Sequence, residues 1–144
     1  MIINQQYFGC FGHLKKRPFP PTAIVIHHTC TQSPARTRQS LKSQGYSTHF
    51  EVDRDGMIYQ YASENDICLH CGSPNFTCIG IDITHPKDGT FTEAQIESTK
   101  ALVISLCEKY SIPQEIHEHL SGIYPHRAIG RTACPQNFPM ERLK

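Results

Sequence analysis

Histidine and cysteine are the residues of this 144-residue chain whose types and spacing could do chemistry. The chain has nine histidines and seven cysteines, and both residue types are common zinc ligands. His27 and His28 end an apolar segment, and His126 and Cys134 lie eight positions apart in a later one. A catalytic zinc site uses three protein ligands and leaves a fourth position for water. One ligand on a strand and two on a later loop would build such an open site, although spacing alone leaves many histidine triplets open.

Apolar and alternating segments predict the strands that must position these residues. Residues 22–28 are β-branched and apolar on both faces, which predicts a buried central strand. Residues 48–53 and 57–61 flank a turn, which predicts a β-hairpin. Residues 79–84 alternate, with isoleucines on one face and Asp82 on the other, so a cleft is expected on the face that carries Asp82.

Capping signals predict two helices. Ser33, followed by a proline, is a typical N-cap, and Gly45 is a typical C-terminal stop, which together predict a helix over residues 34–44. The capping-box pattern of residues 92–95 begins a second helix, whose apolar residues fall at helical spacing as far as about Tyr110.

The remaining residues set the domain limits. Residues 1–21 are predicted to form a loop-like N-terminal arm, because their prolines oppose a helix, and the Lys15-Lys16-Arg17 run is expected on the surface. Residues 22–144 form the domain itself, and the chain from residue 114 on is expected to be mostly irregular. Strands that flank helices in this order predict an α/β fold, a single domain with a mixed central β-sheet packed by helices.

Charge and hydropathy exclude several classes of protein. The chain has 14 Lys plus Arg and 13 Asp plus Glu, a formal net charge of +1, whereas a nucleic-acid-binding domain usually carries a basic face. The longest apolar run, residues 101–107, is far shorter than the ~20 residues of a membrane span. No ordinary secretory signal is visible at the N-terminus. We therefore expect no nucleic acid and no membrane span, and a cytoplasmic location before release.

Five short motifs follow one another in a fixed order. They are Ile24-Val-Ile-His-His-Thr29, Ser47-Thr-His-Phe-Glu-Val-Asp-Arg-Asp-Gly56, Leu69-His-Cys-Gly72, Ile79-Gly-Ile-Asp-Ile83 and the segment from His126 to Cys134-Pro135. In this order they resemble the zinc-dependent N-acetylmuramoyl-L-alanine amidases, a family that includes phage lysozyme-type amidases and peptidoglycan recognition proteins. The resemblance covers residues 22–141. It implies that family's fold, one Zn2+ per chain, and hydrolysis of the amide bond between N-acetylmuramic acid and the L-alanine of the stem peptide.

The same resemblance implies the zinc ligands. The family's two zinc histidines match His27 and His126, and its third ligand, a cysteine in the phage and recognition-protein branches, matches Cys134. His28 is expected to pack or to form hydrogen bonds. His119 is the rival second ligand, but only His126 has the family's spacing to the Cys-Pro pair.

The residues that assist catalysis match the family only in part. Asp82 stands where many bacterial members have a glutamate, and it is expected to act as the general base and to return the proton to the leaving amine. Thr132 stands where phage-type members have a lysine, and Thr132 or Tyr46 is expected to stabilise the oxyanion. Thr48 stands where those members have a tyrosine. Glu51 or a tyrosine is the alternative base.

His70, Thr48 and Asn75 are expected to contact the substrate, since His70 matches the groove-lining histidine of the family's Trp-His-Ala-Gly segment. The implied partner is peptidoglycan or a muropeptide, cut by a monomer that acts on the cell wall, in the periplasm or outside the cell, after lysis or specialised export. A non-catalytic recognition module is the alternative function, but such relatives typically replace the cysteine ligand that this chain keeps. A structural zinc site would usually have four protein ligands.

The other cysteines allow several interpretations. Cys68 and Cys71 have the spacing of half a zinc knuckle or of a redox pair, but the second pair that a knuckle needs is missing. Cys107, on the apolar face of the second helix, is expected to be a core thiol. A disulfide among Cys30, Cys68, Cys71 and Cys78 is expected if the protein works in an oxidising space.

Overall fold

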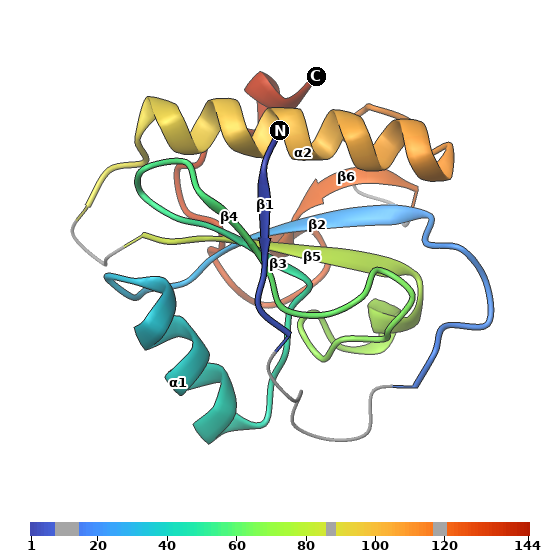
Figure 1. Ribbon diagram of the computed structural model, residues 1–144. Helices are drawn as coiled ribbons and strands as arrows, with labels where there is room; N and C mark the ends of the chain where they lie inside the picture. Colours follow the sequence, from blue (N-terminus) through green and yellow to red (C-terminus); the bar gives the residue numbers. More distant parts are fainter. Residues whose placement is uncertain (8–14, 86–88, 117–120) are drawn as a thin grey trace.

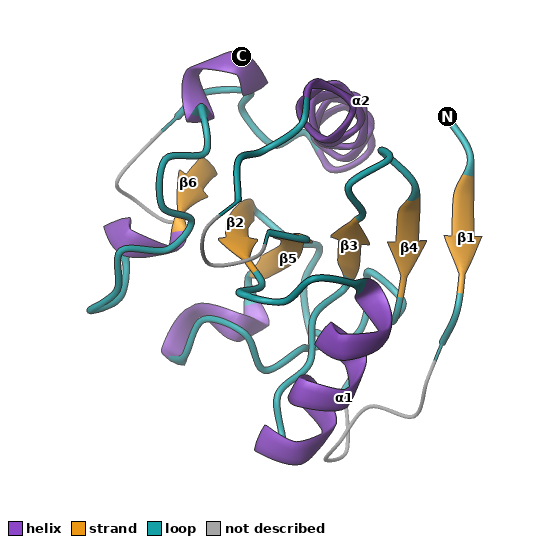
Figure 2. Ribbon diagram, turned by 90° about the vertical axis from the view of Figure 1, so that its left-hand side faces the viewer, coloured by secondary structure: helices purple, strands orange, loops and turns teal. Residues whose placement is uncertain are grey.

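A computed structural model of the chain describes residues 1–7, 15–85, 89–116 and 121–144. Within them, six strands form one mixed sheet in the order β1-β4-β3-β5-β2-β6, and Figure 2 shows them side by side in this order from right to left. The strands are β1 (Ile3–Gln5), β2 (Ala23–His28), β3 (Phe50–Val52), β4 (Ile58–Gln60), β5 (Cys78–Ile83) and β6 (Gly122–Pro125). Only β3 and β4 pair antiparallel; the other neighbours are parallel.

The two α-helices lie on opposite faces of the sheet (Figures 1 and 2). Helix α2 (Glu93–Tyr110) covers one face, and helix α1 (Pro34–Gln44) lies below the other. The main core lies on the α2 side, where Ile79, Ile81 and Ile83 of β5 join the apolar residues of α2. Because side chains alternate along a strand, His27 and Asp82 point to the opposite face, as the isoleucine pattern predicts.

Both α-helices begin at their predicted caps. The Ser33 side chain accepts a hydrogen bond from the backbone N–H of Arg36, and Gly45 ends α1 in the left-handed conformation, with φ of 73°. At the start of α2, the Thr92 hydroxyl and the Gln95 side chain bond reciprocally to each other's backbone N–H. These local hydrogen bonds satisfy donors that a helix terminus would otherwise leave unpaired. The predicted bounds of both helices are thereby confirmed.

The central strand, the hairpin and the isoleucine-rich strand are confirmed, but two further strands were not predicted. The arm contains β1, which pairs in parallel with the outer edge of β4. The segment expected to be irregular contains β6, which pairs in parallel with β2. Sequence analysis missed both strands for the same reason: a short strand with a distant parallel partner has little periodic signal of its own, and its hydrogen bonds depend on tertiary contact.

The expectation that Arg17 lies in a surface patch is also wrong. Arg17 is 8% exposed, and its guanidinium donates to the backbone carbonyls of Glu64, Asp66, Phe76 and Cys78. A guanidinium has five N–H donors and can satisfy several carbonyls at once, so Arg17 ties the arm to the loop that leads into β5.

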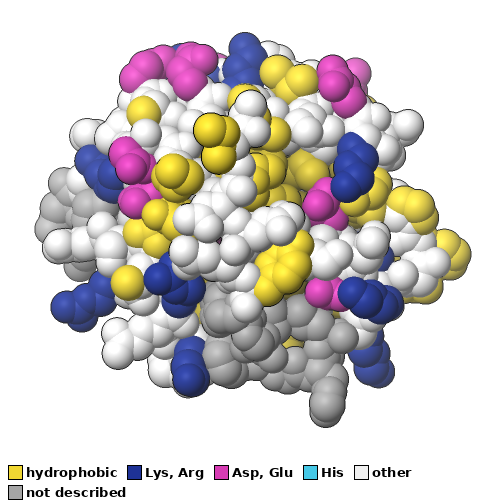
Figure 3. Space-filling model, viewed as in Figure 1, with side chains coloured by type: hydrophobic (Ala, Val, Ile, Leu, Met, Phe, Trp, Pro, Cys, Tyr) yellow, Lys and Arg dark blue, Asp and Glu magenta, His cyan; other side chains and the backbone are white. Residues whose placement is uncertain are grey.

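The charged side chains on the surface are mixed in sign, which agrees with the formal net charge of +1. The face shown in Figure 3 carries acidic and basic side chains side by side, without a large area of one sign. Among the described residues, no helix is long and apolar enough to cross a membrane.

Candidate metal centre and catalytic cleft

The three residues expected to bind zinc lie together at one edge of the sheet. One donor atom from each of His27, His126 and Cys134 lies within 4.8 Å of the others. The Cys134 Sγ is 4.0 Å from the His27 Nδ1, and the His27 and His126 ring centroids are 4.6 Å apart. Two imidazoles and a thiol at this spacing suit a tetrahedral zinc ion, whose Zn–N and Zn–S bonds are about 2.0 and 2.3 Å.

Strand β2 and the chain after β6 position these ligands. His27 lies near the carboxyl end of β2, and the parallel pairing of β2 with β6 brings β6 alongside it. His126 begins the 3-10 helix η2 (His126–Ala128) directly after β6. The backbone N–H of Arg127 donates to the Cys134 carbonyl, and the backbone N–H of His28 donates to the Cys134 Sγ. Strand pairing and these loop contacts therefore bring the three candidate ligands together.

Burial favours the neutral form of each of the three candidate ligands. Desolvation, followed by the nearby His126 and His28, lowers the pKa of His27 well below its usual value. Desolvation also lowers the pKa of His126 and raises the pKa of the Cys134 thiol to about 12. Neutral imidazoles are the metal-binding form, whereas the thiol must lose its proton when a metal binds.

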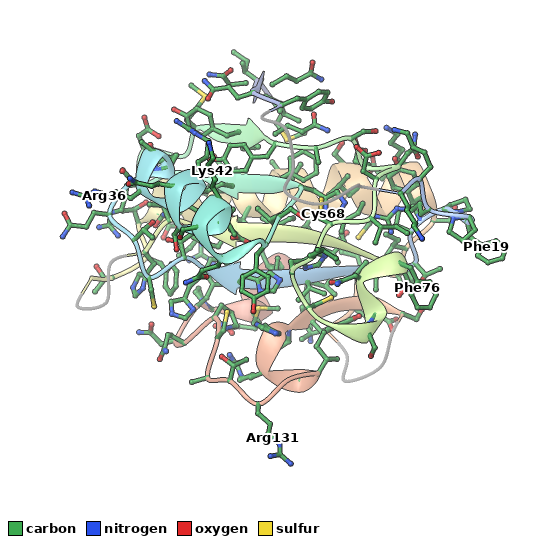
Figure 4. All side chains as sticks on the ribbon, turned by 90° about the horizontal axis from the view of Figure 1, so that it is seen from below. Phe19, Arg36, Lys42, Cys68, Phe76 and Arg131 are labelled. Atoms are coloured by element: carbon green, nitrogen blue, oxygen red, sulfur yellow. The ribbon has the colours of Figure 1, made fainter. Side chains whose placement is uncertain are left out.

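The cluster opens into a cavity of about 740 Å³ between α1 and the loops that follow β4 and β6. Figure 4 views this side of the sheet from below, with Arg131 pointing away from the protein. Among the predicted site residues, the cavity is lined by His27, Tyr46, His70, Asn75, Asp82, His126, Thr132 and Cys134. The structure thus brings eight of the nine to one cavity, which is large enough for a small-molecule or peptide segment.

Asp82 stands in the cavity wall beside the ligands. It pairs in register with His27 across β5 and β2. The Thr48 hydroxyl donates to the Asp82 Oδ1 at 3.0 Å, and Thr48 is only 1% exposed. Thr48 therefore supports Asp82 from behind and is not among the residues that line the cavity. Desolvation, and then the charge of Glu51, raises the pKa of Asp82 to about 8, opposed by the Thr48 hydrogen bond.

Glu51, the alternative base, is fully buried and does not line the cavity. Its carboxylate accepts hydrogen bonds from the hydroxyls of Thr37, Tyr61 and Thr84 at 2.8, 2.7 and 2.6 Å. Desolvation raises the pKa of Glu51 against these three bonds. The group thus connects α1, β3 and the ends of β4 and β5 behind the cavity, and it has no access to substrate.

The two residues expected to stabilise the oxyanion occupy different places. The Thr132 Oγ1 accepts the backbone N–H of Cys134 at 3.1 Å, which leaves its own hydrogen free to be donated into the cavity. Tyr46 lies on the rim just after α1 and is 53% exposed.

His70 contacts His27, a candidate metal ligand, and sequence analysis did not predict this contact. The His27 Nε2 and the His70 Nδ1 are 2.9 Å apart. Asn75 holds the same loop, because its Oδ1 accepts the backbone N–H groups of His70 and Cys71. The signal in the sequence was Gly80: a Cβ there would lie 2.8 Å from the His70 Nδ1 and 2.8 Å from the Thr48 Oγ1.

The remaining histidine and cysteine predictions have mixed outcomes. The His28 ring lies 3.0 Å from the Cys30 Sγ, as a hydrogen-bonding histidine should. Cys107 is a buried core thiol, as predicted. The described cysteines are free thiols, so the expected disulfide among Cys30, Cys68, Cys71 and Cys78 is not formed. The rival ligand His119 lies outside the described residues.

An α/β domain with a His-His-Cys cluster and a buried carboxyl group in an open cavity is the arrangement expected of a metal-dependent hydrolase. The family model of N-acetylmuramoyl-L-alanine amidase matches residues 17–137. The chain belongs to this family, and its activity is hydrolysis of peptidoglycan as an N-acetylmuramoyl-L-alanine amidase.

Relatives and solved structures agree with this assignment. The endolysin of Enterobacteria phage T3 is 27% identical over 141 residues, which cover 88% of this chain and 87% of the phage protein. The N-acetylmuramoyl-L-alanine amidase LysC from Clostridium intestinale URNW superposes with a TM-score of 0.85 at 28% identity, covering 100% of this chain and 95% of LysC. A complex of peptidoglycan recognition protein ectodomains, at 19% identity, 95% and 91% coverage and a TM-score of 0.74, shares the fold.

Proposed function

We propose that this amidase is zinc-dependent, with one ion held by His27, His126 and Cys134, and that Asp82 is its general base. The observation that carries the proposal is the convergence of these three donor atoms within 4.8 Å in the cavity that Asp82 also lines. Zinc in such a site lowers the pKa of a coordinated water to about 7 and polarises the substrate carbonyl. The open cavity favours a catalytic site over a closed structural one.

Asp82 has the geometry and the pKa of a proton acceptor. The Thr48 hydroxyl bonds to Oδ1, and Asp82 lines the cavity, so the Asp82 Oδ2 is the oxygen proposed to take the proton of the attacking water. A carboxyl pKa raised to about 8 is close to neutrality, where a general base can accept a proton and later return it to the leaving amine. The leaving group here is the α-amine of L-alanine.

The other cavity residues bind and orient the substrate. The Thr132 Oγ1 already accepts the Cys134 N–H, so the Thr132 hydroxyl hydrogen donates to the oxygen of the substrate carbonyl under attack. Tyr46, on the rim, is the second donor. The Asn75 side-chain N–H groups remain for a stem-peptide carbonyl, since its Oδ1 is engaged by the loop backbone.

The relatives support a place of action for this chain. We infer that it is made in the cytoplasm and meets the cell wall after lysis or specialised export, as a monomer. The name endolysin, borne by the relative from phage T3, supports this inference.

Metal analysis combined with product analysis tests the proposal. The purified protein should hold about one zinc per chain, and the Cys134→Ser variant should lose most of the zinc and the activity. Digestion of muropeptides should release free L-alanine amino termini without new reducing sugar ends. Full activity in the presence of chelator, with no detectable metal, would contradict the zinc assignment.

A further inference from the structure

The two nitrogens of the His27 ring face different neighbours. Its Nδ1 lies 4.0 Å from the Cys134 Sγ, on the side of the metal cluster. Its Nε2 lies 2.9 Å from the Nδ1 of His70, and the two rings meet edge-on with centroids 5.1 Å apart. Only Nδ1 of His27 is therefore free to bind a metal, and its Nε2 is engaged by His70.

The proposed metal site determines which of the two rings donates. A neutral imidazole that binds a metal through Nδ1 carries its proton on Nε2. Across the 2.9 Å contact, the His27 Nε2–H then donates to the His70 Nδ1, which acts as the acceptor.

Several contacts fix the position of the His70 ring. The His70 backbone N–H donates to the Asn75 Oδ1 at 3.0 Å, and the His49 ring packs edge-on against the His70 ring, with centroids 5.7 Å apart. Gly80 of β5 leaves the space that the ring occupies, because a Cβ at this position would lie 2.8 Å from the His70 Nδ1 and 2.9 Å from its Cγ. A loose groove-lining side chain would not need backbone, ring and glycine contacts of this kind.

We propose that His70 is a positioning residue of the metal centre: it accepts the His27 Nε2–H and so fixes the tautomer and the ring orientation of this ligand. The inference rests on the zinc site proposed above. Partners of this kind hold ligand histidines in the correct tautomer, and their loss typically weakens metal binding by about 10–100-fold. His70 also lines the cavity, but its first effect is on zinc affinity and not on substrate binding.

The test compares an acceptor and a non-acceptor at position 70. In His70→Asn the Oδ1 takes the place of the Nδ1 and still accepts, whereas His70→Leu fills a similar volume without an acceptor. Zinc affinity, measured by competition with a chromophoric chelator, should fall about 10–100-fold in the leucine variant and stay within a few-fold of the wild type in the asparagine variant. The absorption spectrum of the Co2+-loaded protein should shift in the leucine variant only.

Two further variants complete the experiment. Gln44→Leu changes another residue that lines the cavity and should leave zinc affinity unchanged. Gly80→Ala should displace the His70 ring and weaken zinc binding with His70 intact, which covers the case of a leucine variant that does not fold. A Cβ at position 80 would also displace the Thr48 hydroxyl. This hydroxyl bonds Asp82 and not a proposed ligand, so its displacement should not change zinc affinity.

The outcomes separate this inference from the zinc proposal. A wild-type protein that binds no zinc would refute the proposed metal centre itself. A wild type that binds zinc, with His70→Leu binding it equally well, would overturn the role of His70. Equal loss in the leucine and asparagine variants would also overturn it, because the acceptor would then not matter. Unchanged zinc affinity with a raised KM would reassign His70 to substrate binding.

Discussion

Replacing Thr48 by valine should change the pH dependence of catalysis without changing the metal site. Valine matches the shape of threonine but lacks the hydroxyl that donates to the Asp82 Oδ1 at 3.0 Å. This hydrogen bond lowers the pKa of Asp82, which burial and the charge of Glu51 otherwise raise to about 8. Because Thr48 is buried, water cannot take the place of the lost donor. The pKa of Asp82 should therefore rise.

The size of the effect follows from the strength of the bond. A hydrogen bond to a charged group contributes about 1.5–3 kcal/mol, and one pKa unit corresponds to about 1.4 kcal/mol. The Asp82 pKa should thus rise by about one to two units. Since the ionised carboxylate is the base, kcat/KM at neutral pH should fall about 10–100-fold and should recover as the pH rises through the new pKa.

The assay is the pH profile of kcat/KM on a soluble muropeptide, with zinc content measured on the same samples. The Thr48→Ser variant, which keeps the hydroxyl, is the matched control and should follow the wild-type profile. Coincident acid limbs for the valine variant and the wild type, at equal zinc content, would refute Asp82 as the group that limits the rate on the acid side.

Three other variants test the surrounding structure. Asp82→Asn should keep zinc but lower kcat by about 10²–10⁴-fold, and full activity would move the base elsewhere. Burial raises the pKa of Glu51 above its usual 4.5, so the folded state binds the Glu51 proton more tightly than the unfolded state does. The stability that this proton contributes is lost as the pH rises through the folded pKa. The urea-unfolding free energy of the wild type minus that of Glu51→Gln should therefore decrease with rising pH; a flat difference would contradict the reasoning. Arg17→Met removes a hydrogen-bond donor from four backbone carbonyls and should lower the unfolding free energy by about 2–4 kcal/mol, whereas an unchanged thermal midpoint would show that Arg17 does not stabilise this part of the fold.

Local patterns in the sequence were enough to predict most elements and the three residues of the candidate metal site. The caps at Ser33 and Thr92 act within one helical turn, so the sequence shows them directly. The alternation of residues 79–84 separated the isoleucine face from the face of Asp82, because the period of a strand does not depend on its partners. The eight-residue step from His126 to Cys134 is equally local, and the resemblance to the amidase family added His27.

Tertiary contacts decided what each of these side chains does. Strand β6 forms only because β2 offers a parallel edge to it, about a hundred residues earlier in the chain. Arg17 is buried because four backbone carbonyls between Glu64 and Cys78, distant in the chain, accept from its guanidinium. Thr48 supports Asp82, and His70 contacts His27, across strands that the sequence does not show to be neighbours. The sequence by itself determined the residue types and periods of this amidase, whereas the donor and acceptor partners depend on the pairing of distant strands, which only the folded chain defines.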